Sequence, residues 1–443
     1  MKKTQNISEN NNKRKENFTF VDLFSGIGGF HQALESLGGK CVAASEINSS
    51  CNETYKKNFP QTPILGDIKK EWTKLPKFDI LCAGFPCQPF SKAGKQNGFN
   101  DKEHGKLFDV IIDILKNHKE CKFVILENVR NLSDKLTNWQ IIQEKLKQLD
   151  FFVTKKPVIL SPSQFKIPQI RERVYILGIK KKIRNPKKLS NGFIHLEELG
   201  LTNIPSALKS LNNGDAWNIL EPNPDKKYFL LKPENEILNI WDEFRKGTNY
   251  EQSNVPIWID YFGYKLSDSE FNSKKFYQTK YKTNKQISEL PEWKKKFAIK
   301  NRNFYLKHKE FIDKWIEKYN MLNKKSIHKK FEWNCGNDFE SLKDTIIQFR
   351  HSGIRAKRPN YFPTLVALNN TPILWDKELK NFRYITPREA ANLQSFKKEY
   401  KFSENDSKTY KQLGNAVNVY IIQILASKLI NFALDNWKEM EIK

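Results

Sequence analysis

The chain has 443 residues, which is enough to bury a large core and to form two domains. Its net charge of +26 and its pI near 9.5 favour an anionic partner or surface. No continuous apolar segment suits a membrane, so we exclude a membrane protein and favour nucleic acid as the partner.

The cysteines show neither the paired spacing of a metal site nor a disulfide framework. The six residues are Cys41, Cys51, Cys82, Cys87, Cys121 and Cys335. We expect reduced thiols, no bound metal and a cytoplasmic protein. Residues 1–17 are polar, rich in Lys and Asn, and lack an apolar signal-peptide core. They are expected to form a disordered basic arm.

The first predicted element is a strand at 18–24, followed by a glycine-rich turn at 25–29 and a helix at 31–37. This order is the first half of a βαβ unit, in which glycines let the backbone approach a ligand closely. The spacing matches the Gly-x-Gly-x-x-Gly dinucleotide fingerprint only in part. By itself, the turn indicates a nucleoside cofactor of unspecified kind.

Two further predicted strands end in carboxylates. A strand at 40–45 leads into Glu46, which can accept hydrogen bonds from ribose hydroxyls or can simply be a surface residue at a strand end. A strand end at 64–68 carries Asp67, whose carboxylate suits the exocyclic amine of adenine.

A cysteine between two prolines follows the next predicted strand, at 78–83. The sequence there is Gly84-Phe85-Pro86-Cys87-Gln88-Pro89. Prolines restrict the backbone, so this loop holds Cys87 in a nearly fixed place beyond the end of a strand, where α/β sheets bind ligands. Cys87 is therefore a candidate nucleophile, with a buried structural cysteine in a tight turn as the alternative.

A predicted amphipathic helix at 107–117 leads to an apolar strand at 123–126, which ends in Glu127. Two strand ends would then present a thiol and a carboxylic acid at the same rim of a sheet. A helix at 139–149, a strand at 151–160 and a strand at 174–178 follow.

Two arginines enter the last of these strands at alternating positions. Arg171 and Arg173 therefore share one face of the chain. They either contact a phosphate or a base oxygen there, or form a solvated edge.

The alternating βα pattern stops after residue 178. Residues 180–345 are rich in Lys, Asn and aromatics, and 271–320 is predicted to be mostly helical. Interleaved bases and aromatics suit nucleic acid, but amphipathic helices over a small core give the same pattern. Thr386 before Pro387 is a helix start, and an apolar helix at 419–433 is expected to pack on the first domain.

Taken together, the ordered motifs resemble the cytosine-C5 DNA methyltransferase family. They cover about the first 180 and the last 60 residues of the chain. The matching segments are 22–29, Glu46, 66–68, 84–91, 127–129, 169–173, Arg388-Glu389 and 414–417. A segment at 350–366 also looks like one found in some bacterial members.

The resemblance implies an α/β fold: a doubly wound, Rossmann-like methyltransferase domain with a smaller, irregular target-recognition domain. We place the catalytic, cofactor-binding domain at 18–182 and 405–443. The target-recognition domain and its hinge are placed at 183–404.

The resemblance also implies the chemistry. Cys87 would add to carbon 6 of a flipped cytosine, Glu127 would act near the ring nitrogen N3, and Arg171 and Arg173 would hold the active loop and the target base. The cofactor is S-adenosylmethionine, with S-adenosylhomocysteine as product. Its expected contacts are Phe24, Gly26, Ile27, Gly28, Glu46, Ile47, Asp67, Ile68, Gly84, Pro86, Leu107, Asn415, Ala416 and Val417.

The expected function is therefore DNA (cytosine-5-)-methyltransferase acting on double-stranded DNA. We expect a monomer in a bacterial cytoplasm, associated with the nucleoid through DNA, with a cognate restriction endonuclease acting separately. A tRNA cytosine-C5 methyltransferase with the same core is the alternative. Amino-methyltransferases are disfavoured because their Asp/Asn-Pro-Pro-aromatic motif is missing from the sequence. A catalytically dead DNA-binding module is disfavoured because Cys87 and Glu127 are both present.

Overall fold

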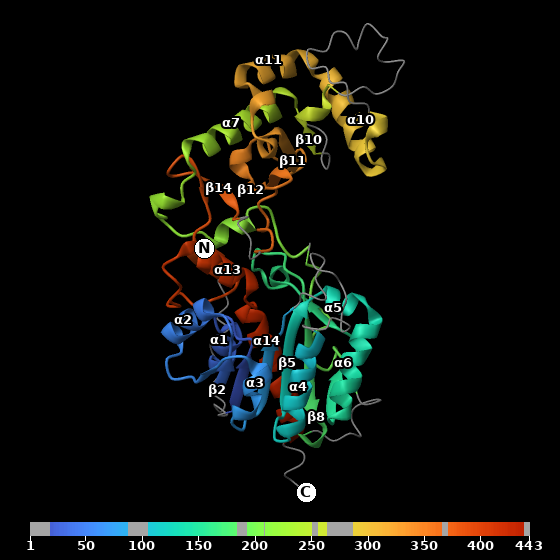
Figure 1. Ribbon diagram of the computed structural model, residues 1–443, viewed down its shortest axis with the longest axis vertical. Helices are drawn as coiled ribbons and strands as arrows, with labels where there is room; N and C mark the ends of the chain where they lie inside the picture. Colours follow the sequence, from blue (N-terminus) through green and yellow to red (C-terminus); the bar gives the residue numbers. More distant parts are fainter. Residues whose placement is uncertain are drawn as a thin grey trace, which may run out of the picture. The chain divides into compact units, whose positions relative to one another are not determined.

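The computed structural model describes residues 18–86, 105–183, 193–207, 209–249, 256–263, 287–365 and 371–437 (Figure 1). The chain forms two compact units: unit 1 comprises Met1–Leu211 and Ala390–Lys443, and unit 2 comprises Asn212–Glu389. The expected basic arm at 1–17 lies outside the described residues.

Unit 1 is larger than the domain boundaries drawn from the sequence, because it also takes in 183–211 and 390–404. The reason lies in local contacts. Strand β9 (Phe193–Ile194) pairs with β6 (Phe151–Thr154), which extends the sheet past residue 182. The carbonyl of Gln394 accepts a hydrogen bond from the Val419 amide at 3.0 Å, which ties the segment after residue 390 to the C-terminal helix.

A nine-stranded sheet forms the centre of unit 1, in the order β3-β2-β1-β4-β5-β8-β6-β9, with β7 paired to β8. The remaining strands are β1 (Thr19–Leu23), β2 (Lys40–Ser45), β3 (Ile64–Leu65), β4 (Ile80–Gly84), β5 (Phe123–Val129), β7 (Val158–Leu160) and β8 (Arg173–Lys180). Strands β1 to β5 are mutually parallel, and β8 is antiparallel to β5. The doubly wound α/β prediction is confirmed.

The topology explains why the motifs meet. The chain runs outward from β1 through β2 to β3, and then returns to place β4 on the other side of β1. Such a switch point opens a crevice beyond the carboxyl ends of the strands, where α/β sheets bind ligands. Because β1 to β5 are parallel, the residues that follow β1, β2, β3 and β4 lie at one edge.

Helices cover both faces of this sheet, as Figure 1 shows. Apolar residues of α4 and α6 pack in one core with Val21, Leu81 and Val124 of the strands. On the other face, α1 packs against α14 and its His31 ring contacts Phe20. The helices with residues in unit 1 are α1 (Gly29–Glu35), α2 (Ser49–Asn58), α3 (Ile68–Glu71), α4 (Gly105–Asn117), α5 (Asn131–Asp134), α6 (Leu136–Gln148), α12 (Pro387–Leu393), α13 (Asp406–Asn415) and α14 (Val419–Trp437).

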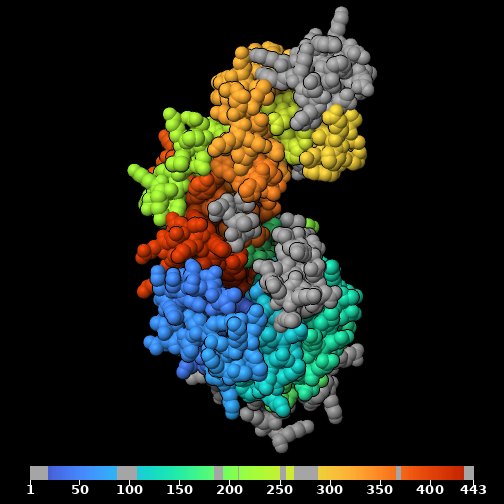
Figure 2. All heavy atoms as spheres, viewed as in Figure 1, coloured from blue at the N-terminus to red at the C-terminus, as the bar shows by residue number. Residues whose placement is uncertain are grey.

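In the space-filling view, the blue N-terminal segment and the cyan-to-green segment after it form one continuous body of unit 1 (Figure 2). The single strand predicted at 151–160 is two strands, β6 and β7, because Pro157 lies between them and cannot donate to a ladder. The predicted start of α12 is confirmed: the Thr386 hydroxyl accepts from the Glu389 amide at 3.1 Å.

The apolar C-terminal helix packs into unit 1, as expected. By length and composition alone, Asp406–Ala433 could cross a membrane, but half of its most apolar window is buried inside the protein. Ile421, Leu425 and Leu429 are fully buried. That burial is typical of a core helix.

Unit 2 is more regular than the sequence suggested. It holds a six-stranded sheet in the order β10-β11-β13-β12-β14-β15. Its strands are β10 (Ile257–Trp258), β11 (Lys330–Asn334), β12 (Ile346–Arg350), β13 (Gly353–Lys357), β14 (Ile373–Asp376) and β15 (Asn381–Tyr384), and its helices are α7 (Lys232–Gly247), α10 (Glu292–Lys307) and α11 (Lys309–Tyr319). Each strand has at most five residues, so apolar alternation is too brief to stand out in the sequence.

An aromatic core holds unit 2 together. Trp241 of α7 stacks on Phe331 of β11 and lies against Trp315 of α11. The helical prediction for 271–320 is confirmed for α10 and α11, and its part at 271–286 lies outside the described residues. The interleaved aromatics of this region therefore serve a core in several places.

A buried histidine beneath the glycine turn gives a testable pH dependence. His31 stacks on Phe59, and its Nδ1 lies 2.6 Å from the Tyr55 hydroxyl. Burial, with a smaller contribution from Lys397, lowers the pKa of His31 to about 3. A depressed histidine pKa gives stability that is present above about pH 6.5 and is lost as the pH falls.

We therefore expect the free energy of unfolding to fall by about 3 kcal/mol more in the wild type than in His31→Phe between pH 7 and pH 4. Urea unfolding at the two pH values measures this difference. Equal losses in both proteins would show that His31 does not titrate as its burial implies.

Candidate active site

The turn after β1 has a backbone shape that needs glycine. Gly26 and Gly28 have positive φ angles of 55° and 81°, and Phe24 also lies in the left-handed region at 55°. A Cβ on Gly26 would meet no atom within 4 Å, whereas one on Gly28 would come within 2.6 Å of Phe59. The turn therefore packs tightly on one side and is open at Gly26.

Glu46 closes this turn from the end of β2. Its Oε2 accepts from the Gly26 amide at 2.9 Å, and its Oε1 accepts from the Asn48 amide at 2.7 Å. The next residue, Ile47, is 78% exposed, which is unusual for a large apolar side chain at a strand end. A carboxylate and an exposed apolar side chain thus stand next to the open glycine.

Asp67 follows β3 at the same edge and caps α3. Its Oδ1 accepts from the Lys69 amide at 3.1 Å, and its side chain remains about a quarter exposed. The neighbouring Ile68 is buried in the core of unit 1. The Asp67 side chain is therefore accessible to a ligand. The side chain of Ile68 is not, so Ile68 can contact a ligand only through its backbone.

The ends of β4 and β5 bring two predicted site residues together. Gly84 pairs with Glu127 across the two strands. Glu127 is 8% exposed, and its Oε1 lies 3.1 Å from Arg173 Nε. Burial raises the pKa of the Glu127 carboxyl, and the positive charges of Arg173 and Arg171 only partly oppose this effect. Glu127 thus holds its proton to a higher pH than an ordinary glutamate.

The loop that carries Cys87 is anchored just before the cysteine. The Asn128 side chain donates from Nδ2 to the Phe85 carbonyl at 3.1 Å. Asn128 is 1% exposed and follows Glu127 directly on β5. Cys87 itself lies outside the described residues. The described residues that lead to it are strand β4, Phe85 with its bond to Asn128, and Pro86.

Arg171 is buried and contacts the C-terminal loop. Its Nη2 donates to the carbonyls of Gly414 and Ala416, at 2.9 and 3.1 Å, and its own amide donates to the Ser161 hydroxyl. The two bonds to the Gly414 and Ala416 carbonyls join segments more than 240 positions apart in the sequence. Arg173, in contrast, reaches Glu127, so the two arginines have different partners.

The C-terminal loop completes the edge. Val417 packs against the glycines of both neighbouring turns, since a Cβ on Gly29 would lie 2.7 Å from it and one on Gly84 would lie 3.7 Å from it. Asn415 is exposed. Ile27 and Leu107 are buried, so their contribution to a site is the shape of its wall.

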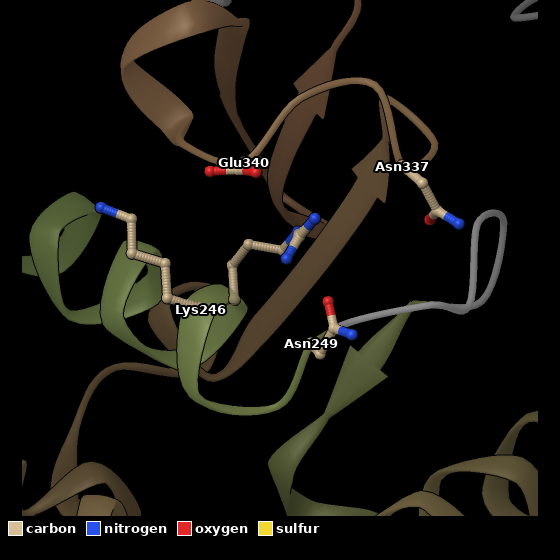
Figure 3. A pocket seen from close by; sticks show the side chains of 5 residues that line it. Lys246, Asn249, Asn337 and Glu340 are labelled. Carbon is tan, nitrogen blue, oxygen red and sulfur yellow. The ribbon is translucent and has the colours of Figure 1, made fainter.

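Among the described residues, no group of three or more His, Cys, Asp or Glu side chains is placed to hold a metal ion. A cavity of about 650 Å³ lies in unit 2 and is lined by Arg245, Lys246, Asn249, Asn337 and Glu340 (Figure 3). None of the predicted site residues lines it. Its side chains come from the end of α7 and from the loop after β11.

A family model described as C-5 cytosine-specific DNA methylase matches residues 18–431. The chain belongs to this family. The methylase is 32% identical to the Type II methyltransferase M.AluI of Cellulosimicrobium cellulans, over 93% of this chain and 91% of the relative. It is 33% identical to the Type II methyltransferase M.BanI of Aneurinibacillus aneurinilyticus, over 91% and 94% of the two chains.

Solved structures agree on the fold. The Schizosaccharomyces pombe Dnmt2 methyltransferase covers 94% of the methylase and matches with a TM-score of 0.52 at 16% identity; 99% of its own chain is matched. The family and the relatives make the methylase a cytosine-C5 DNA methyltransferase, as the motifs predicted. The tRNA-methylating alternative is not favoured, because the matching family model and these curated relatives are DNA methylases and Type II methyltransferases.

The sequence did not single out Asn128 as a site residue of the methylase. The signal was available, since Asn128 directly follows Glu127 in the motif and a polar side chain after a buried strand needs a partner. The two carbonyl acceptors of Arg171 could not be foreseen, because they lie in the C-terminal loop.

Proposed function

We propose that the enzyme transfers a methyl group from S-adenosylmethionine to carbon 5 of a cytosine flipped out of a specific double-stranded DNA sequence. The observation that carries the proposal is the pairing of Gly84 with Glu127. This pairing puts a buried carboxyl with a raised pKa beside the strand end that leads into the Pro86-Cys87 loop.

The residues at the edge of β1 to β4 fit the cofactor. The Gly26 turn leaves open space for a ligand against the backbone, Glu46 has lone pairs for ribose hydroxyls, and exposed Ile47 offers an apolar surface for a base. The Ser25 hydroxyl is buried with no hydrogen-bond partner among the described residues, as expected where a ligand completes the site. S-adenosylmethionine, when bound, supplies an activated methyl group and leaves as S-adenosylhomocysteine.

Cys87 provides the nucleophile in this proposal. Carbon 5 of cytosine is a poor nucleophile, but addition of the Cys87 thiolate to carbon 6 breaks the C5–C6 double bond and places its electron pair on carbon 5. Glu127 hydrogen-bonds N3 through its retained proton and stabilises the charge that the addition creates. After methylation, a base removes the proton from carbon 5, the double bond re-forms and the Cys87 thiolate leaves.

The two arginines support these steps differently. Arg173, beside the Glu127 carboxyl, orients it and is available to the oxygen of the target base. Arg171 is a positioning residue, because its guanidinium bonds to backbone carbonyls at 414 and 416 fix the loop that carries Asn415. The base must leave the stacked duplex, since carbon 6 is inaccessible within it.

The biological role proposed is protection of DNA in a restriction-modification system, with a separate endonuclease cutting the same sequence. The relatives' names as Type II methyltransferases support this role. The net charge of +26 supports binding to the DNA backbone. The proposal includes a monomer acting in the bacterial cytoplasm and target recognition by unit 2.

The test is transfer of a labelled methyl group from S-adenosylmethionine to plasmid DNA, followed by bisulfite sequencing. We expect protected cytosines at every copy of one short sequence and none elsewhere. Label that appears on tRNA but not on duplex DNA, or methylation of cytosine at N4, would overturn the proposal.

A Glu46→Ala variant should bind S-adenosylmethionine about 10- to 100-fold more weakly, because it loses charge-assisted hydrogen bonds to ribose and the bond that fixes the Gly26 amide. Isothermal calorimetry measures the affinity. Glu35→Ala, which removes a half-exposed carboxylate of α1, is the control and should bind normally. Unchanged cofactor affinity in Glu46→Ala would place the pocket elsewhere.

A further inference from the structure

One face of the unit 2 sheet is polar although the other face is a core. Strands β11, β13 and β12 lie side by side, and Phe331, Ile354 and Ile347 point into the core. The alternate residues share the opposite face, because side chains alternate along a strand. That face carries one buried apolar residue, Ile346 beside Lys357, and otherwise polar side chains: Lys330, Glu332, Asn334, Gln348, Arg350, Arg355 and Lys357.

Two of the three cations on this strand pair, Arg350 and Arg355, share the Glu332 carboxylate, and Lys357 has no carboxylate partner among the described residues. Arg355 binds Glu332 in a bidentate way, with Nε and Nη2 at 2.6 and 2.8 Å. Arg350 Nη1 lies 3.5 Å from the same carboxylate. No Asp or Glu of the described chain lies within ion-pair distance of Lys357, which is 5.5 Å from the Tyr361 ring. The group of four side chains thus has two positive charges in excess.

These cations are held together at an electrostatic cost. Burial lowers the pKa of Lys357, and the charges of Arg355 and Arg350 lower it further. Burial and Arg355 also lower the pKa of Arg350. Its buried Nη1 makes no hydrogen bond to a described residue. A fold gains nothing from such repulsion, so the arrangement indicates a site that an anion completes.

We propose that the Arg350–Arg355–Lys357 face of unit 2 binds a phosphate of the DNA backbone, with Lys357 and Arg350 as its donors and Arg355 held in place by Glu332. This inference rests on the proposed action on double-stranded DNA. A phosphate fits better than a base edge, because an excess of two charges is neutralised by an anion and not by a neutral base. The Arg350 side chain is 31% exposed and Lys357 is half-buried, so a ligand can reach both donors.

The test is the salt dependence of duplex binding by Lys357→Met, measured by fluorescence anisotropy on a duplex that the enzyme methylates and on a scrambled duplex. We expect affinity to fall on the order of tenfold for both duplexes, since a charge-assisted hydrogen bond to phosphate is lost in each. The slope of log affinity against log salt should become shallower by about 0.9. Arg350→Gln should behave in the same way.

Two further measurements separate this role from a structural one. Lys357→Met should unfold at a higher temperature than the wild type, because it removes like-charge repulsion. Lys343→Met is the matched control: Lys343, in the 3₁₀ turn Leu342–Asp344, lies 4.3 Å from the Trp375 ring as Lys357 lies over Tyr361. The control should retain the wild-type slope.

Three outcomes would overturn the inference. They are unchanged affinity in Lys357→Met, a loss confined to the methylated sequence with an unchanged slope, and an equal change in the Lys343→Met control. Failure of the proposed function would look different, because the wild type itself would then show no methyl transfer to DNA.

Discussion

Cys87→Ala should lose methyl transfer by about 10⁴-fold or more while it still binds S-adenosylmethionine and DNA. Removal of a covalent nucleophile has effects of this size, because no other group replaces its chemistry. Cys87→Ser should be nearly as inactive, since a hydroxyl is a far weaker nucleophile than a thiolate at neutral pH. Single-turnover kinetics with labelled cofactor measure both variants.

The other cysteines are unsuited to this role. Burial raises the pKa of the Cys121 thiol to about 12 and that of Cys335 to about 12. Cys41 and Cys82 are buried, with their pKa values also raised by burial. Even half-buried Cys51 has a pKa raised to about 12, by burial and by the charge of Glu46. None of these five thiols is a ready source of thiolate at neutral pH.

DNA with 5-fluorocytosine at the target position should trap the enzyme covalently, because fluorine on carbon 5 blocks the final elimination. A denaturing gel shows the adduct as a shifted band. Cys51→Ala is the control and should trap like the wild type. Trapping that persists in Cys87→Ala would remove Cys87 from the mechanism.

The edge that carries these residues was largely predictable from the sequence. Buried parallel strands are continuous apolar runs, and each ends in a conspicuous polar or glycine residue, as at Glu46, Asp67 and Gly84. Parallel pairing then brings those ends together without further information. The open space at Gly26 follows from the same local signal, since only glycine tolerates that turn easily.

The rest depends on contacts between distant segments. The bond from Arg171 to the Gly414 carbonyl spans 243 positions, and no local pattern encodes such a pair. In unit 2, β11 pairs in parallel with β13, although β12 lies between them in the sequence. These short strands therefore become a sheet only through tertiary packing. The cation group on that sheet was invisible for the same reason, because Glu332 and Arg355 meet only once the strands are paired.

Glu127→Gln should lower the rate of methyl transfer by about 10²- to 10⁴-fold, the usual contribution of a positioned acid. The amide keeps the shape of the side chain, but its N–H donates a weaker hydrogen bond to N3 than the carboxylic acid does, and it has no proton to transfer as the charge develops. Glu172→Gln is the control, since Glu172 is partly exposed and ion-paired with Arg130 at 2.7 Å. A surface pair contributes little, so that variant should stay active.

The same substitution tests why Glu127 holds its proton. Burial raises its pKa above the unfolded value, with Arg173 and Arg171 opposing the effect. A carboxyl with a raised folded pKa gives stability that is present below about pH 4.3 and is lost as the pH rises through the folded pKa. Urea unfolding at a series of pH values from about 4.3 upward should therefore show the free energy of unfolding of Glu127→Gln rising relative to that of the wild type. If Glu127→Gln instead lost stability relative to the wild type as the pH rises, the arginines would outweigh burial, and the carboxyl would be ionised and unable to donate to N3.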